Sequence, residues 1–174
     1  ADNGDYTVRM VGGQVLDNAD PSPNAVPAGD LGSFAVDIFV QDVTPPTASL
    51  SSAPDVLSDG GTTYQITINY TDADSGMDAA SYDVDDISVT GPAGALPVAG
   101  ISASGDSVTY TLTPPGGSWA FSDNGQYSIS INADEVFDTA TPTPNAAAAE
   151  PIGSFDVFIP EPNPDEIFRN GFES

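Results

Sequence analysis

Closely spaced acidic side chains are the groups in this sequence best suited to form a chemical site. Asp72 and Asp74 have the Asp-x-Asp spacing that begins many calcium-binding loops, and Asp78 follows four residues later. Carboxylate oxygens are ligands that Ca²⁺ prefers, so this spacing indicates a hard-cation site. The segment is not an EF-hand loop, because its sixth position is Met77 rather than glycine and its twelfth is Asp83 rather than glutamate.

The composition argues against most kinds of catalysis. Among 174 residues there are 26 acidic side chains and two basic ones, Arg9 and Arg169, and there is no lysine, histidine or cysteine. The chain therefore has no imidazole base, no thiol nucleophile and no lysine for Schiff-base or phosphate chemistry. Its net charge of −24 repels nucleic acid and anionic membrane surfaces. We therefore expect a protein that is not an enzyme, does not bind nucleic acid and does not insert into a membrane.

An internal repeat predicts the domain organisation. The segment Asp2–Ile38 aligns without a gap to Asp123–Ile159, and 17 of the aligned positions are identical. A repeat of this length fits one β-sandwich of about 100 residues with a linker. We therefore expect the C-terminal part of one repeat in residues 1–43, a complete repeat in 44–160, and a flexible C-terminal tail in 161–174. On this interpretation the chain is a piece of a longer protein.

Hydrophobic alternation predicts strands along the complete repeat. The clearest run has Tyr64, Ile66, Ile68 and Tyr70 at every second position, which is the period of a half-buried strand. Glycine- and proline-rich turns separate such runs, and the whole pattern gives about seven strands: 48–50, 64–70, 86–90, 98–103, 108–112, 127–131 and 155–159. The predicted fold class is an all-β, immunoglobulin-like antiparallel β-sandwich, with aromatic residues of the strands in its core.

This fold would gather the acidic side chains at one end. In an immunoglobulin-like sandwich, the loop after the second strand and the loop between the last two strands lie at the end where the chain enters. Two interpretations fit this cluster: Ca²⁺ bound at the domain junction, or solvated turn residues that keep the protein soluble. The candidate metal ligands are Asp42, Asp72, Asp74, Asp78, Glu135 and Asp138.

Trp119 and the partial repeat each raise an alternative. Trp119, the only tryptophan, could stack on a sugar ring as a ligand-binding residue or pack at the edge of the core. The two strands of residues 1–43 cannot bury their own apolar face, so side chains such as Val8 and Phe34 would be exposed. We expect this segment to be disordered, or to pair with the rest of its own domain or with the edge strand of another chain.

The segments DVTPPTASL, YTDADSGMDAASYDVDDISVTGP and PPGGSWAFSDNGQYSISINADEVFDTA together resemble the bacterial immunoglobulin-like repeats of large secreted and surface proteins. The tail resembles a short C-terminal motif of exported Gram-negative proteins, carried by Ile167, Phe168, Asn170, Gly171, Phe172 and Glu173. The resemblance implies a non-catalytic module, secreted or on the bacterial cell surface, that acts as a structural spacer or adhesive element.

The expected partners of this module are neighbouring immunoglobulin-like domains of the same chain, surface glycans, or another chain by edge pairing. The alternative is an accessory carbohydrate-binding module of a secreted hydrolase, with Trp119 contacting the polysaccharide.

Overall fold

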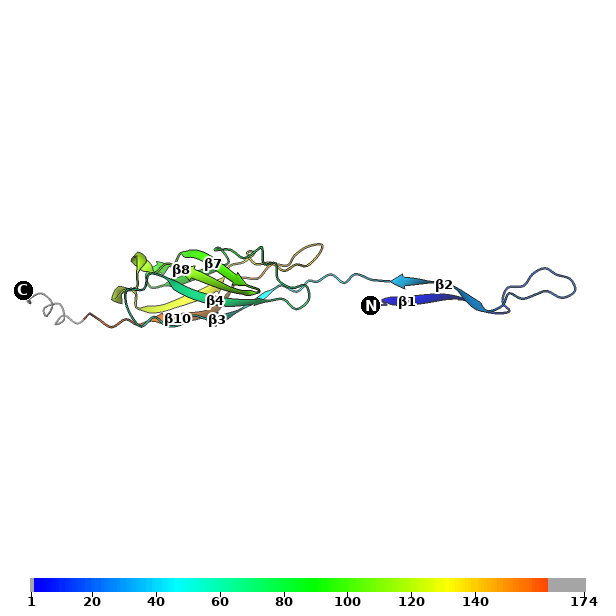
Figure 1. Ribbon diagram of the computed structural model, residues 1–174, viewed down its shortest axis with the longest axis horizontal. Coiled ribbons are helices and arrows are strands. Elements are labelled where there is room, and N and C mark those ends of the chain that lie inside the picture. Colours follow the sequence, from blue (N-terminus) through cyan, green and yellow to red (C-terminus); the bar gives the residue numbers. More distant parts are fainter. Residues whose placement is uncertain (1, 163–174) are drawn as a thin grey trace, which may run out of the picture. The chain divides into compact units, whose positions relative to one another are not determined.

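The computed structural model describes residues 2–162, which form two compact units divided between Val40 and Gln41 (Figure 1). The predicted C-terminal motif, Ile167 to Glu173, lies outside the described residues. Among the residues described, no helix has the length and apolar character needed to cross a membrane.

The first unit is a β-hairpin. Strand β1 (Gly4–Met10) pairs antiparallel with β2 (Gly29–Val36), so that Tyr6 lies opposite Phe34 and the two rings stack with centroids 5.5 Å apart. The long connection between the strands is closed by a bridge between Leu16 and Ala25. Val8 and Phe34 are exposed, as expected from the sequence. The segment has defined strands rather than an irregular backbone.

The second unit is an all-β sandwich of two four-stranded antiparallel sheets, which confirms the predicted fold class at that level. One sheet has the order β10-β9-β5-β6 and the other β3-β4-β8-β7. All seven expected strands are present, and the short β6 is an addition. The bounds are β3 (Thr47–Ser52), β4 (Tyr64–Thr71), β5 (Ile87–Gly91), β6 (Gly94–Ala95), β7 (Val98–Ser104), β8 (Ser107–Leu112), β9 (Gly125–Ile131) and β10 (Glu150–Val157).

Two 3₁₀ turns, Pro115–Gly117 and Phe121–Asp123, lie between β8 and β9 and were not expected from the sequence. The core lies between the two sheets. Strand β4 alternates buried and less buried residues as predicted, and Tyr64, Tyr70, Tyr110 and Tyr127 are all buried.

A chain of hydrogen bonds crosses this core and ends on a buried carboxylate. The Tyr110 hydroxyl lies 2.6 Å from Asp86 Oδ2 and 2.7 Å from the Tyr70 hydroxyl. An ionised carboxylate only accepts hydrogen bonds, so Tyr110 donates to Asp86 and accepts from Tyr70. Asp86 is fully buried, and its Oδ1 has no hydrogen-bond partner. Burial outweighs the hydrogen bonds from Tyr110 and from the backbone N–H of Asp83, and it raises the pKa of Asp86 to about 6.

We predict that Asp86 makes the sandwich less stable as the pH rises from 4 to 7. Because the pKa is higher in the folded protein than the 3.8 of the free group, folding favours the protonated form. The stabilisation is complete below pH 4 and is lost as the pH rises through about 6, with a total on the order of 2–3 kcal/mol. Urea unfolding of Asp86→Asn should lack this component, and the exposed Asp85→Asn should keep it. Parallel pH profiles for wild type and Asp86→Asn would contradict the prediction.

Candidate metal centre

Backbone hydrogen bonds join two loops at one end of the sandwich. The Asp78 N–H donates to the Phe137 carbonyl and the Thr139 N–H donates to the Gly76 carbonyl, both at 2.9 Å. The Thr139 hydroxyl also donates to the Ser75 carbonyl, at 2.5 Å. The loop that follows β4 is therefore fixed to the loop between β9 and β10 by hydrogen bonds within the protein, which require no ligand.

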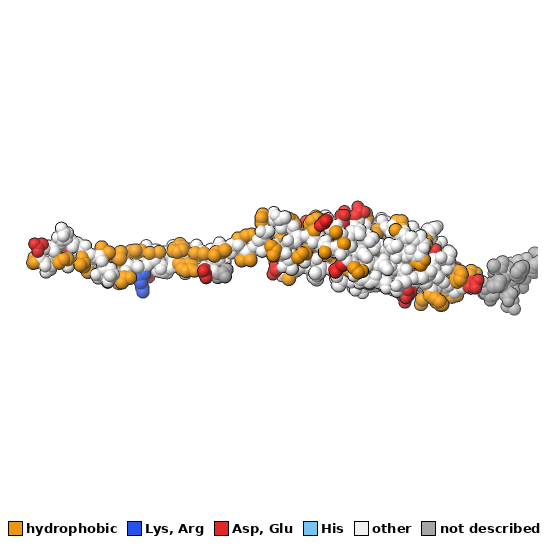
Figure 2. Space-filling view, turned by 180° about the vertical axis from the view of Figure 1, so that it is seen from behind, with side chains coloured by type: hydrophobic (Ala, Val, Ile, Leu, Met, Phe, Trp, Pro, Cys, Tyr) orange, Lys and Arg blue, Asp and Glu red, His pale blue; other side chains and the backbone are white. Residues whose placement is uncertain are grey.

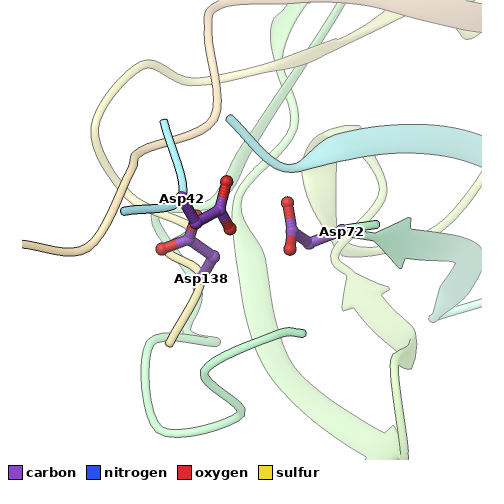
Figure 3. A group of neighbouring side chains, drawn as sticks. All are labelled: Asp42, Asp72 and Asp138. Atoms are coloured by element: carbon purple, nitrogen blue, oxygen red, sulfur yellow. The ribbon is translucent and has the colours of Figure 1, made fainter. Parts of the chain in front are cut away.

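Three of the predicted carboxylates meet at this junction. One oxygen from each of Asp42, Asp72 and Asp138 lies within 4.8 Å of the others. Figure 3 shows the carboxylates of Asp42 and Asp72 facing each other, with Asp138 beside Asp42. The three residues come from the segment before β3, the loop after β4 and the loop between β9 and β10.

Each of Asp42 and Asp72 has one carboxylate oxygen held by backbone N–H groups. Asp72 Oδ1 accepts from the N–H groups of Asp74, Ser75 and Gly76 at 2.8–3.1 Å, and Asp42 Oδ1 accepts from the Thr44 N–H at 2.8 Å. The Oδ2 atom of each carboxylate is buried and has no hydrogen-bond partner. A buried acceptor without a donor is unfavourable, so each of these two atoms calls for a hydrogen-bond donor or a cation.

Asp138 is oriented by Asn145. The Asn145 side-chain amide donates to Asp138 Oδ2 at 2.7 Å, and the backbone N–H groups of Asn145 and Ala140 donate to Oδ1 at 2.7 and 3.0 Å. Burial opposes ionisation of Asp138 most strongly, but these hydrogen bonds together outweigh it and lower the pKa. The same balance lowers the pKa of Asp72, where burial is opposed by the N–H groups of Ser75, Gly76 and Asp74. Asp72 and Asp138 are therefore ionised at neutral pH.

No basic side chain within residues 41–162 offsets the electrostatic repulsion within this cluster. Both arginines of the chain, Arg9 and Arg169, lie outside residues 41–162, and the sequence has no lysine or histidine. Like charges within about 5 Å repel, more strongly when partly buried than in bulk water. The arrangement has the hard oxygen ligands and the charge that suit a divalent cation such as Ca²⁺.

The other three predicted ligands are not part of this group. Asp74 is exposed and accepts from the Thr44 hydroxyl, and Asp78 accepts from the Ala80 N–H within its own turn. Glu135 is partly exposed and has no side-chain hydrogen bond among the residues described. The sequence did not single out Asn145, although its repeat equivalent Asn24 donates the same two hydrogen bonds to Asp17, and the Ala19 N–H donates the third. The identical Pro-x-Pro-Asn context of the two asparagines was the available signal.

Trp119 is 3% exposed and lies among aromatic rings of the core. Its ring packs edge-on against Tyr64, Tyr127 and Phe155, with centroids 5.4–6.2 Å apart. This agrees with the packing interpretation, because a stacking platform for sugars needs an exposed ring face.

No protein-family model matches this chain, and no curated protein matches it significantly.

We predict that Asp138→Ala destabilises the sandwich by on the order of 2–4 kcal/mol in EDTA, because it leaves the buried N–H of Ala140 and the part-buried donors of Asn145 without an acceptor. Urea unfolding measures this loss. Asp17→Ala is the matched control, since Asp17 accepts the same three bonds in the exposed hairpin and should leave the unfolding of the sandwich unchanged. Equal effects of the two substitutions, or none at Asp138, would contradict this role of Asp138.

Proposed function

We propose that this protein is a non-catalytic, extracellular, immunoglobulin-like repeat module of a bacterial surface or secreted protein, in which Ca²⁺ fixes the entering linker to the sandwich. The observation that carries the proposal is the pair of buried, unpartnered Oδ2 atoms of Asp42 and Asp72 beside the carboxylate of Asp138. A divalent ion between them would supply the missing partner for both oxygens and offset the repulsion among three carboxylates.

The position of Asp42 gives the proposed site a mechanical role. Asp42 follows the end of the first unit, Val40, by two residues, whereas Asp72 and Asp138 belong to loops already joined to each other. The hydrogen bonds between this entering segment and the loops are long: the Asn145 amide donates to the Asp42 carbonyl at 3.4 Å, and the Thr44 hydroxyl donates to Asp74 at 3.3 Å. A shared ion would restrain the direction in which the linker enters, which is what a spacer of fixed length requires.

The ligand set also supports an extracellular location. Three carboxylates in surface loops resemble the weak calcium sites of extracellular modules, whose dissociation constants are about 10⁻⁴–10⁻³ M. Such a site fills where calcium is millimolar. The repeated units, separated by a short linker, support the role of a spacer in a tandem array.

We predict that 10 mM CaCl₂ raises the Tm of the sandwich above its value in EDTA. With a dissociation constant of about 10⁻⁴ M, mass action gives about 2.7 kcal/mol, or roughly 5–15 °C for a domain of this size. Asp72→Asn should abolish most of the rise. Asp74→Asn, which removes an equal charge two residues away at an exposed position, should retain it.

Equal concentrations of MgCl₂ control for general screening of a chain with 26 acidic residues. Mg²⁺ favours a strict octahedron and keeps several waters, so it should produce a smaller rise. Superimposable melting curves in EDTA and in CaCl₂ would refute the cation site, as would an equal rise in Asp72→Asn.

A further inference from the structure

The exposed apolar residues of the hairpin are the repeat equivalents of buried core residues. Tyr6, Val8, Phe34 and Ile38 are 42–53% exposed. Adding the repeat offset of 121 (123 minus 2) gives Tyr127, Ile129, Phe155 and Ile159, all of which are 3% exposed or less. In Figure 2, hydrophobic side chains accordingly run along much of the surface of the hairpin.

The hairpin already has the conformation of the β9–β10 pair. Both pairs have the same register, with Tyr6 opposite Phe34 and Tyr127 opposite Phe155, and both have a bulge at the equivalent position. The loop bonds to Asp17 match those to Asp138. The side chain of Asn3 binds the backbone of Ile38 as that of Asn124 binds Ile159. The hairpin is thus organised for a sandwich that it does not itself contain.

Two glycines indicate what covers the equivalent face. A Cβ atom at Gly153 would lie 2.4 Å from the side chain of Leu50, and one at Gly125 would lie 2.5 Å from Pro92, so both glycines make room for segments that precede β9. Gly32 and Gly4 occupy the equivalent positions of the hairpin, where a Cβ would meet nothing within 4 Å. Glycine at these positions fits neighbours equivalent to Leu50 and Pro92.

The free edge of strand β1 indicates the same missing neighbours. In the sandwich, β9 pairs with β10 on one side and with β5 on the other, through Ile87 opposite Ile131 and Val89 opposite Ile129. Strand β1 pairs only with β2 among the residues described. A strand equivalent to β5 and a facing sheet equivalent to β3-β4-β8-β7 would together complete the structure.

We infer that the hairpin docks onto a segment equivalent to Thr44–Phe121, preceding it in the same polypeptide, and forms with it a second sandwich. Ser122 is the repeat equivalent of Ala1, so residues 44–121 placed directly before Ala1 keep the spacing of the repeat. A second copy of the chain is the weaker partner, because its strands β3 to β8 already pack against their own β9 and β10. The inference rests on the tandem-repeat part of the proposed function and does not require a cation.

The test joins residues 44–121 directly before Ala1 of the full chain. Hydrogen–deuterium exchange in EDTA is followed by mass spectrometry for peptides from β1 and β2 in the original and the extended chain. The amides of β1 should exchange at least about 100-fold more slowly in the extended chain, because they enter a packed core. Sedimentation should show both chains as monomers. Working in EDTA keeps the result independent of the calcium proposal.

Two variants of the extended chain make the test specific. Phe34→Asp places a charge where the equivalent Phe155 is buried, so it should abolish the protection of β1 and leave β9 protected. Ser33→Asp adds the same charge at the neighbouring position, whose equivalent Ser154 is exposed, and should retain the protection.

A third chain consists of residues 44–174 alone. It shows that the added segment 44–121 folds when its own strands β9 and β10 follow it. If that chain folds while β1 in the extended chain exchanges as fast as in the original, the inference is wrong. Strong protection of β1 in the original chain together with a dimeric mass would also overturn it, by assigning the face to a second copy.

Discussion

Coverage of the apolar face of β9 and β10 is the constraint on which the rest of the structure depends. The rings of Tyr64, Trp119, Tyr127 and Phe155 pack against one another across the sheets, and stacked or edge-on aromatic contacts add to the free energy of burial. Where this face is covered, the chain forms a sandwich. Where the same sequence pattern lacks a partner, in the hairpin, the equivalent side chains remain exposed. One chain thus contains both states of the same structural element.

Folding of the sandwich in turn brings negatively charged side chains together at one of its ends. Closing the two sheets brings the loop after β4 against the loop between β9 and β10, and the hydrogen bonds of Gly76, Asp78 and Thr139 fix the two loops together. The carboxylates of Asp72 and Asp138 come with them, although residues 41–162 contain no basic side chain. Hydrogen bonds from backbone N–H groups, and at Asp138 also from the Asn145 amide, stabilise the ionised forms of these two carboxylates. Both therefore stay ionised at neutral pH, and protonation does not relieve their repulsion. A bound cation would relieve it.

Much of this organisation could be predicted from sequence, and the exceptions have physical reasons. Strict alternation in the strands predicted the sheets and the buried tyrosines, and the 121-residue offset predicted an unsupported pair of strands. Only three of six proposed ligands converge, because side-chain direction in loops depends on local bonds: Asp78 turns back to the Ala80 N–H. Asp86 was missed as a buried acid, since its environment depends on Tyr110, a residue of the facing sheet that is distant in sequence. The environment of Trp119 likewise depends on residues from three other parts of the chain.

The cation proposed for Asp42, Asp72 and Asp138 can be located directly. The most direct measurement is an anomalous difference map from crystals of the full chain grown in millimolar CaCl₂, with data collected where calcium scatters anomalously. The account predicts one peak about 2.3–2.6 Å from Oδ2 of Asp42 and of Asp72 and from a carboxylate oxygen of Asp138. A map with no peak among these three side chains, or with calcium only at other acidic residues, would contradict it.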